Sequence, residues 1–280
     1  MKKITCLILI LFFSTSSLTV FADDFVNEPI ININEFDDIA TSNNFASTPN
    51  INARHAIVID RASETTLYGK KETEQCKMAS TTKIMTAIVV IENVKDLSQK
   101  VTISKKSAGT GGSRLGLSTN DTITVDNLLY GLMMCSGNDA AVALAEFVGN
   151  SVENFSNLMN QEATKLGLKN THFVTPHGFD NDDHFTTAYD LAILTNYALK
   201  NETFSKIVRT KNYTVNINGN PKNLNNTNEL LGNFDGIYGV KTGFTNGANR
   251  CLVTSCKRGN LDIICVVLGL SLIHISEPTR

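Results

Sequence analysis

The 280-residue sequence has no excess of charge of either sign. Its 25 lysines and arginines nearly balance 27 aspartates and glutamates, which gives a formal net charge of −2. A domain that binds nucleic acid normally carries a basic surface that neutralises phosphates. The balanced charge therefore argues against a nucleic-acid partner, and we expect none.

The apolar run near the start, "ITCLILILFF", is too short to be a good membrane span. Two lysines precede it, and "SLTVFA" follows with small residues up to Ala22. This pattern is typical of a secretory signal, so we predict a signal peptide over 1–22 and a location outside the cytoplasm, at the cell wall or the outer face of the cytoplasmic membrane. The polar, Asn- and Asp-rich residues 23–53 are predicted to form a flexible leader.

Outside the predicted signal, the sequence also lacks an even number of cysteines. Of the six cysteines, Cys6 lies in the predicted signal, and the other five have no spacing typical of metal ligands. A chain of this size can bury a core without disulfides. We therefore predict that most of these cysteines are buried small apolar side chains.

Two common hydrolase signatures are missing. No His-Glu-x-x-His is present, so a metallopeptidase would have to use His177, Asp180 and His184, an alternative that we disfavour. "GGSRLG" is one residue out of register for Gly-x-Ser-x-Gly, which excludes a nucleophile elbow there. We expect no metal and no other cofactor.

The order of predicted elements is strands, then helices, then strands. This order predicts an α+β fold in which strands from both ends of the chain form one sheet, covered by helices. Asp126, Ser151 and Thr187 are predicted helix N-caps. The predicted strands cover 55–60, 64–69, 212–219, 236–244, 249–258 and 261–270, with short strands or extended loops at 100–109 and 121–127. The predicted helices cover 81–93, 127–134, 138–149, 152–167 and 188–200.

"MASTTKIMTA" places Ser80 three residues before Lys83, at the start of the apolar helix over 81–93. Residues three apart on a helix share a face. A serine hydroxyl needs a base to become a nucleophile, and a lysine can be that base when burial lowers its pKa. A lone Ser-x-x-Lys would be better interpreted as a cap followed by a solvated lysine.

Two further motifs support the chemical interpretation. Ser-x-Asn occurs three times, and we select Ser136 and Asn138 because they form a polar break between two strongly apolar helices. Lys-Thr-Gly occurs once, at Lys241 to Gly243, on a strand predicted to be central. A lysine there must face an anion or a cleft, Thr242 offers a hydroxyl to the same anion, and Gly243 lets a substrate backbone approach.

Ser-x-x-Lys, Ser-x-Asn and Lys-Thr-Gly, in this order, form the motif set of penicillin-binding proteins and class A β-lactamases. The segments "LLYGLMMCSGNDAAVALAE", "TPHGFDNDDHFTTAYDLA" and "GVKTGFTNGANRCL" further resemble serine-type D-alanyl-D-alanine carboxypeptidases, from about residue 55 to 270. The resemblance implies a β-lactamase/transpeptidase-like fold, with a mainly antiparallel sheet flanked by helices and a helical subdomain. It places the catalytic domain at 54–269.

The resemblance also implies roles for individual residues. Ser80 would be the acylated nucleophile, Lys83 its base, and Ser136 a proton relay to the leaving amine. Asn138 would bind the substrate amide and help to position Lys83. Binding of the terminal substrate carboxylate would fall to Lys241 and Thr242, and the oxyanion hole to the backbone N–H groups of Ser80 and Phe244. Phe244 stands where family members often have histidine, which leaves its effect on specificity open.

The implied partner is a peptidoglycan stem peptide ending in D-Ala-D-Ala, with β-lactam antibiotics as covalent inhibitors. A DD-endopeptidase, a β-lactamase of the same fold and a non-catalytic penicillin-binding wall protein are the alternatives. No Glu-x-x-Leu-Asn segment lies between Asn138 and Lys241, which makes efficient β-lactam hydrolysis unexpected. Ser80, Lys83 and Lys241 are all present, which argues against the non-catalytic alternative.

The last residues do not fit the family pattern. "LSLIHISEPTR", 270–280, resembles a translated sequencing adapter, so we expect an assembly artefact on a truncated gene. Family members usually continue into a β-rich domain and an amphipathic membrane anchor. We therefore expect membrane association only through such a missing C-terminal region.

Overall fold

The computed structural model describes residues 49 and 51–271. The predicted signal peptide, nearly all of the predicted leader and residues 272–280 lie outside the described residues. The chain divides into two units, residues 1–51 and 52–280, and the second contains every element described below.

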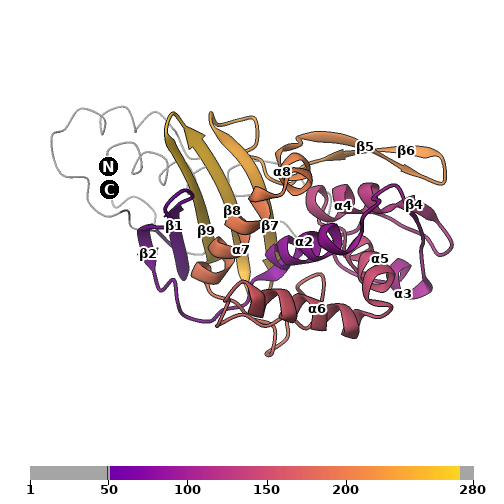
Figure 1. Ribbon diagram of the computed structural model, residues 1–280, viewed down its shortest axis with the longest axis horizontal. Coiled ribbons are helices and arrows are strands. Elements are labelled where there is room, and N and C mark those ends of the chain that lie inside the picture. Colours follow the sequence, from indigo (N-terminus) through magenta and orange to yellow (C-terminus); the bar gives the residue numbers. More distant parts are fainter. Residues whose placement is uncertain (1–48, 50, 272–280) are drawn as a thin grey trace, which may run out of the picture. The chain divides into compact units, whose positions relative to one another are not determined.

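A five-stranded antiparallel sheet forms one layer of this unit (Figure 1). Its strand order is β2-β1-β9-β8-β7, so the first two strands of the chain pair beside the last three. This arrangement confirms the predicted α+β fold with strands from both ends of the chain. The strands are β1 (His55–Asp60), β2 (Thr66–Lys70), β7 (Ile237–Thr245), β8 (Asn249–Arg258) and β9 (Leu261–Leu270).

Helix α2 is the centre of the helical part. It contacts α4, α5, α6, α7 and α8, while α7 packs on β1 and β9 and α8 packs on β7 (Figure 1). The helices are α2 (Lys83–Asn93), α3 (Lys105–Ala108), α4 (Val125–Met134), α5 (Asn138–Gly149), α6 (Val152–Lys165), α7 (Ala188–Lys200) and α8 (Glu202–Arg209). A 3₁₀ turn, η2 (Ala79–Thr82), leads directly into α2.

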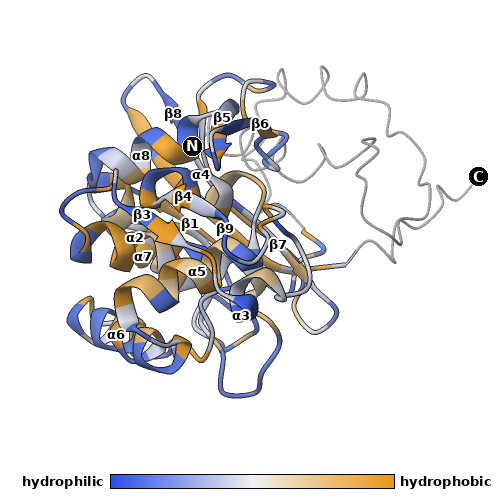
Figure 2. Cartoon of the chain, turned by 90° about the vertical axis from the view of Figure 1, so that its right-hand side faces the viewer, coloured by the Kyte–Doolittle hydropathy of each residue, from blue (hydrophilic) through white to orange (hydrophobic). Residues whose placement is uncertain are grey.

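The burial of each helix follows its sequence pattern. Residues 83–90 of α2 are all buried, as expected for a helix that is apolar on most faces. In α6 only Phe155, Ser156, Met159 and Ala163 are buried, and Figure 2 shows this helix largely blue while α2 is largely orange. Because α2 is a core helix and begins with Lys83, this lysine lies inside the protein.

Two small two-stranded sheets complete the unit. Strands β3 (Lys100–Thr102) and β4 (Thr122–Thr124) form one, and β5 (Asn212–Ile217) and β6 (Asn220–Asn225) form the other. The predicted caps Ser151 and Thr187 are confirmed, since each side chain accepts a backbone N–H three residues later. The predicted cap Asp126 is wrong, because α4 starts two residues earlier than predicted and Thr124 caps it.

The prediction that the strand with Lys241 is central is also wrong. β7 is an edge strand, and its residues 237–241 are buried where η2 and α8 pack against the strand. Cys251, Cys256 and Cys265 are buried as predicted, whereas Cys76 and Cys135 are only partly buried. Within the described residues, no helix is both long and apolar enough to cross a membrane.

Candidate active site

Ser80 and Lys83 meet at the junction of η2 and α2. The predicted single helix over 81–93 is corrected here, because Ser80 lies on the 3₁₀ turn and the α-helix begins at Lys83. The prediction that both side chains point the same way is confirmed, since Lys83 Nζ lies 2.8 Å from Ser80 Oγ. Ala79, just before the serine, has a left-handed φ of 49°, which is uncommon for a residue with a side chain and is found mainly at functional sites.

Three oxygen atoms surround the Lys83 amine. Besides Ser80 Oγ, they are Asn138 Oδ1 at 2.7 Å and the His177 backbone carbonyl at 2.8 Å. The side chain is completely buried. Burial, followed by the nearby positive charge of Lys241, holds the pKa of Lys83 well below its usual value. Burial thus shifts this side chain towards its neutral form.

The hydrogen-bond inventory of a neutral amine fixes the direction of the contact with Ser80. A neutral amine has two N–H donors and one lone pair. The His177 carbonyl and Asn138 Oδ1 can only accept, so they take both N–H groups. The ammonium form donates to Ser80 Oγ, whereas in the neutral form the lone pair then faces Ser80 Oγ and can take the serine proton. This is the geometry that a general base needs to remove the serine proton.

The orientation of the Asn138 amide is set by a loop that crosses the start of α5. Asn138 Nδ2 donates to the Gly111 carbonyl at 2.8 Å, which leaves Oδ1 to face Lys83. A Cβ on Gly112 would lie 2.6 Å from Asn138 Nδ2, so the loop packs directly on this amide. "GTGGSRLG" therefore serves as a support for Asn138.

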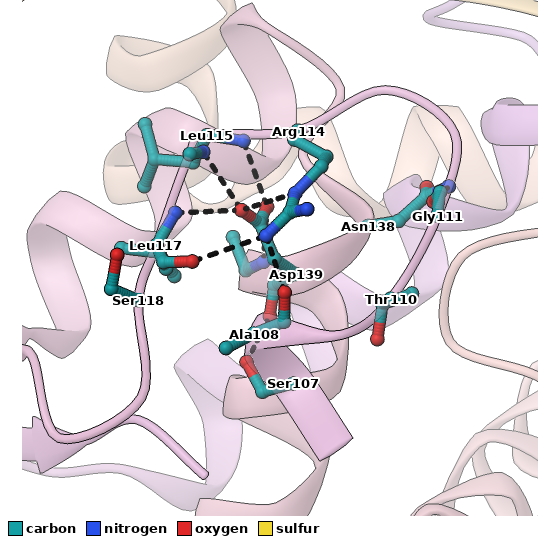
Figure 3. A network of polar contacts seen from close by, with 12 residues as sticks. Ser107, Ala108, Thr110, Gly111, Arg114, Leu115, Leu117, Ser118, Asn138 and Asp139 are labelled. Atoms are coloured by element: carbon teal, nitrogen blue, oxygen red, sulfur yellow. Dashed lines mark hydrogen bonds and ion pairs between the residues drawn. The ribbon is translucent and has the colours of Figure 1, made fainter. Parts of the chain in front are cut away.

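Asp139 holds this loop in place and was not predicted from the sequence. Its completely buried carboxylate accepts backbone N–H groups of Leu115, Gly116 and Leu117 at 2.8, 2.8 and 3.0 Å (Figure 3). Arg114 Nε lies 3.7 Å from the same carboxylate. The only sequence signal was an aspartate directly after the selected Ser-x-Asn motif. Its partners are backbone atoms, which have no signature in the sequence.

Ser136 occupies the turn between α4 and α5, two residues before Asn138. It is buried and has a left-handed φ of 58°. A strained residue in a short polar turn between two apolar helices is consistent with a functional constraint. Its predicted role as a proton relay stays a prediction.

β7 brings the Lys-Thr-Gly motif against the nucleophile. A Cβ on Gly243 would lie 2.9 Å from the backbone N of Ser80, so only glycine allows this close approach. Lys241 is buried, its Nζ donates to the Thr242 carbonyl at 2.8 Å, and burial lowers its pKa to about 7. Thr242 Oγ1 lies 2.8 Å from Thr227 Oγ1. Phe244, the next residue, is 55% exposed.

The loop containing "TPHGF" supports the nucleophile from another side. A Cβ on Gly178 would lie 2.0 Å from the Ala79 carbonyl oxygen, and Gly178 has a left-handed φ of 89°. The same carbonyl accepts from Thr82 Oγ1 at 2.7 Å. His184 Nε2 lies 2.8 Å from Thr82 Oγ1, while its Nδ1 accepts from Val174 N at 3.0 Å. Nε2 therefore carries the proton and donates to Thr82.

The rival set His177, Asp180 and His184 is not assembled as a metal centre. Burial lowers the pKa of His177 to about 3 and that of His184 to about 4, so both imidazoles are neutral near pH 7. His184 uses both ring nitrogens within the protein. Asp180 accepts from Thr245 Oγ1 at 2.7 Å and from Gly247 N at 2.9 Å, which fixes the β7–β8 turn. In the part of the chain that the structure describes, no group of three or more His, Cys, Asp or Glu residues could hold a metal ion.

Comparison with known families agrees with this arrangement. The profile of peptidase family S11, described as D-alanyl-D-alanine carboxypeptidase, matches residues 42–271. The chain belongs to this family. The D-alanyl-D-alanine carboxypeptidase DacF of Bacillus subtilis (strain 168) is 41% identical over 224 residues, which cover 78% of this chain and 58% of the relative. The D-alanyl-D-alanine carboxypeptidase of Streptomyces sp. (strain K15) is 38% identical over 255 residues, which cover 85% of this chain and 88% of the relative.

Solved structures of family members have the same fold. The crystal structure of the Streptomyces K15 DD-transpeptidase matches with a TM-score of 0.77 at 38% identity, over 81% of this chain and 93% of that one. The D-alanyl-D-alanine carboxypeptidase DacD from Francisella tularensis matches with a TM-score of 0.75 at 29% identity, over 80% and 67% of the two chains. The predicted penicillin-binding fold is thereby confirmed.

Proposed function

We propose that this protein is a serine-type D-Ala-D-Ala carboxypeptidase that removes the terminal D-alanine from peptidoglycan stem peptides. The observation that carries the proposal is the buried Lys83 amine, which lies 2.8 Å from Ser80 Oγ and is held by Asn138 Oδ1 and the His177 carbonyl. Family membership supports the same activity. The protein would act outside the cytoplasm and would limit the supply of donors for cross-linking.

The proposed reaction proceeds through an acyl-enzyme. Ser80 Oγ attacks the carbonyl carbon of the penultimate D-alanine and its proton passes to Lys83 Nζ. Backbone N–H groups of Ser80 and Phe244 stabilise the oxyanion. The C–N bond then breaks, and Ser136 relays a proton to the leaving D-alanine amine. A water molecule then loses a proton to the same groups and attacks the ester carbonyl carbon. The ester bond breaks, and the proton returns to Ser80 Oγ.

The substrate carboxylate is assigned to Lys241 and Thr242. Penicillins resemble the D-Ala-D-Ala end, so they should acylate Ser80 as well. Fast deacylation of the penicilloyl-enzyme is not expected, because the sequence between Asn138 and Lys241 lacks the Glu-x-x-Leu-Asn segment of class A β-lactamases. The same acyl-enzyme could pass to an amine instead of water, in line with the name DD-transpeptidase of the K15 structure.

The test is to incubate the protein with a fluorescent penicillin and, separately, with a tripeptide ending in D-Ala-D-Ala. We expect covalent label and D-alanine release from the wild type, and neither from Ser80→Ala. Label that persists in Ser80→Ala would refute the nucleophile assignment. Labelling without D-alanine release would instead favour endopeptidase action or a non-hydrolytic penicillin-binding protein.

A further inference from the structure

The hairpin formed by β5 and β6 is rich in asparagine. Residues 212–228 contain eight asparagines and a single charged residue, Lys222. Asparagine is depleted in strands, because its amide competes with the backbone for hydrogen bonds. The asparagines of this segment therefore need an explanation other than strand formation.

Three of these asparagines have structural partners for both side-chain atoms. Asn218 Oδ1 accepts from Thr122 N at 2.7 Å, and its Nδ2 donates to Asp121 at 2.6 Å. Asn226 and Asn228 also use both atoms of the amide within the protein. The side chains of four others are exposed and have no hydrogen-bond partner in the part of the chain that the structure describes: Asn212, Asn216, Asn220 and Asn225. These four amides play no part in holding the fold.

Most of the free amides lie on one face of the hairpin. Residues that face each other in an antiparallel pair point to the same side, as do residues two apart along a strand. The register therefore defines an amide face, which consists of Asn212, Thr214, Asn216, Pro221, Asn223 and Asn225. All six residues are exposed and none is charged. A hollow of about 490 Å³ takes four of its six lining residues from this face.

The opposite face of the hairpin fastens it beside the active site (Figure 1). Tyr213 stacks on Tyr130 of α4, with ring centroids 3.5 Å apart. Lys222 Nζ donates to the Leu115 carbonyl at 2.6 Å, in the loop that supports Asn138. The one cation of the segment is thus directed away from the amide face, which lies next to the active site and stays neutral.

The chemistry of the amide face selects a class of partner. Each free amide offers two N–H donors and one acceptor oxygen. The face has no cation for a phosphate and no large apolar side chain for a hydrophobic partner. A neutral polymer with many hydroxyl and amide groups matches it. The stem peptides of the proposed substrate are attached to such a polymer, a chain of N-acetylated amino sugars.

We propose that the amide face binds the sugar chain of peptidoglycan and thereby brings its stem peptides to the neighbouring active site. The identity of this partner rests on the proposed function. A polymer held at a second site raises the effective concentration of the peptides that it carries, without any new contact at the reacting atoms. The alternative is that the amide face is a solvated surface with no partner.

The test measures binding to purified sugar chains from which an amidase has removed the stem peptides. The double variant Asn212→Ala/Asn225→Ala removes one facing pair of free amides. It should bind roughly tenfold more weakly than the wild type, as expected for the loss of two hydrogen bonds between neutral groups. Release of D-alanine from a soluble tripeptide should not change, because neither side chain has a partner in the described protein.

Asn220→Ala is the matched control. Asn220 is also exposed and free, but it pairs with Ile217 and so lies on the opposite face. Its loss should leave binding unchanged. A wild type that does not bind the sugar chains, a double variant that binds equally well, or an equal loss in Asn220→Ala would each overturn the proposal.

Release of D-alanine separates this inference from the proposed function. A wild type that releases D-alanine from the tripeptide but does not bind the sugar chains refutes the amide face alone. A wild type that binds the sugar chains through the amide face but releases no D-alanine refutes the proposed function and leaves the binding site standing.

Discussion

Lys83 and Asp139 are both completely buried ionisable residues, and their surroundings are opposite. Lys83 meets three oxygen atoms, of which two can only accept, and its pKa is held well below the usual value. Asp139 meets three backbone N–H groups of 115–117 and the guanidinium of Arg114. The aspartate is thus surrounded by hydrogen-bond donors, whereas burial disfavours the charged form of the lysine.

The two residues are linked through Asn138. Asp139 fixes the loop 110–117, the Gly111 carbonyl of that loop holds Asn138 Nδ2, and Asn138 Oδ1 takes one N–H of Lys83. The buried carboxylate therefore holds the scaffold, and the buried amine lies beside the nucleophile with a pKa that burial lowers. Asp139 thus sets the position of the Lys83 amine through the loop and Asn138.

The largest expected effect comes from removing the amine. Lys83→Met should reduce acylation by penicillin about a thousandfold, because it removes the general base. Its effect on stability should depend on pH. Since the folded-state pKa of Lys83 lies below its unfolded value, the folded wild type binds fewer protons and gains stability as the pH rises towards 10.

Urea unfolding at pH 7 and pH 10 measures this dependence. Relative to Lys83→Met, the wild type should become more stable at the higher pH, with a slope of up to about 1.4 kcal/mol per pH unit. Titrating groups that do not interact with Lys83 are common to both proteins and cancel in the difference, whereas Lys241, which is coupled to Lys83, contributes to it. A stability difference that is the same at both pH values would contradict a neutral Lys83.

Removal of the structural charge should have the next largest effect. Asp139→Ala leaves the N–H groups of the buried residues Leu115 and Leu117 without their acceptor, at a cost of about 1–3 kcal/mol each. We expect the free energy of unfolding to fall by at least about 2 kcal/mol, with slower acylation because Asn138 loses its support. Asp121→Ala is the control, because Asp121 accepts from Ser118 N in an exposed turn. Equal losses in the two variants would show that Asp139 is an ordinary loop aspartate.

The smallest effect is expected from the glycine beneath the nucleophile. Gly178 and Gly219 have similar φ values of 89° and 85°, but a Cβ on Gly178 meets the Ala79 carbonyl whereas nothing lies within 4 Å of one on Gly219. Alanine at either position must adopt a similar left-handed φ, so the backbone strain is similar in both variants. The difference between their acylation rates therefore reports the contact with the Ala79 carbonyl. Gly178→Ala should acylate roughly tenfold more slowly than Gly219→Ala, because it displaces the Ala79–Ser80 backbone. Equal rates would show that this contact does not position Ser80.

Much of the site could be predicted from local sequence. The Ser-x-x-Lys spacing in an apolar segment predicts that Ser80 and Lys83 share a face, and their 2.8 Å contact confirms it. This prediction succeeded because the two residues lie only three positions apart. The predicted approach of a substrate backbone to Gly243 stays a prediction, and the contact of Gly243 with the Ser80 backbone was not predicted.

The errors and omissions involve distant partners. The strand that carries Lys241 was predicted to be central, but it lies at the edge of the sheet and is covered by η2 and α8, which lie far from it in the sequence. Asp139 accepts hydrogen bonds from the backbone N–H groups of residues 115–117, and Gly178 packs against the backbone carbonyl of Ala79. A backbone N–H or carbonyl is the same in every residue, so the sequence could not indicate which ones these side chains and turns would meet.

The central claim is that Lys83 is neutral when Ser80 reacts. The direct measurement is NMR titration of protein labelled with ¹³C at lysine Cε, with Lys83→Met used to assign the resonance. We predict a midpoint well below the usual lysine value of about 10.4, with a second lowered midpoint near 7 for Lys241. A Lys83 midpoint at or above the usual value would mean that the amine is charged at neutral pH, and it would contradict the account.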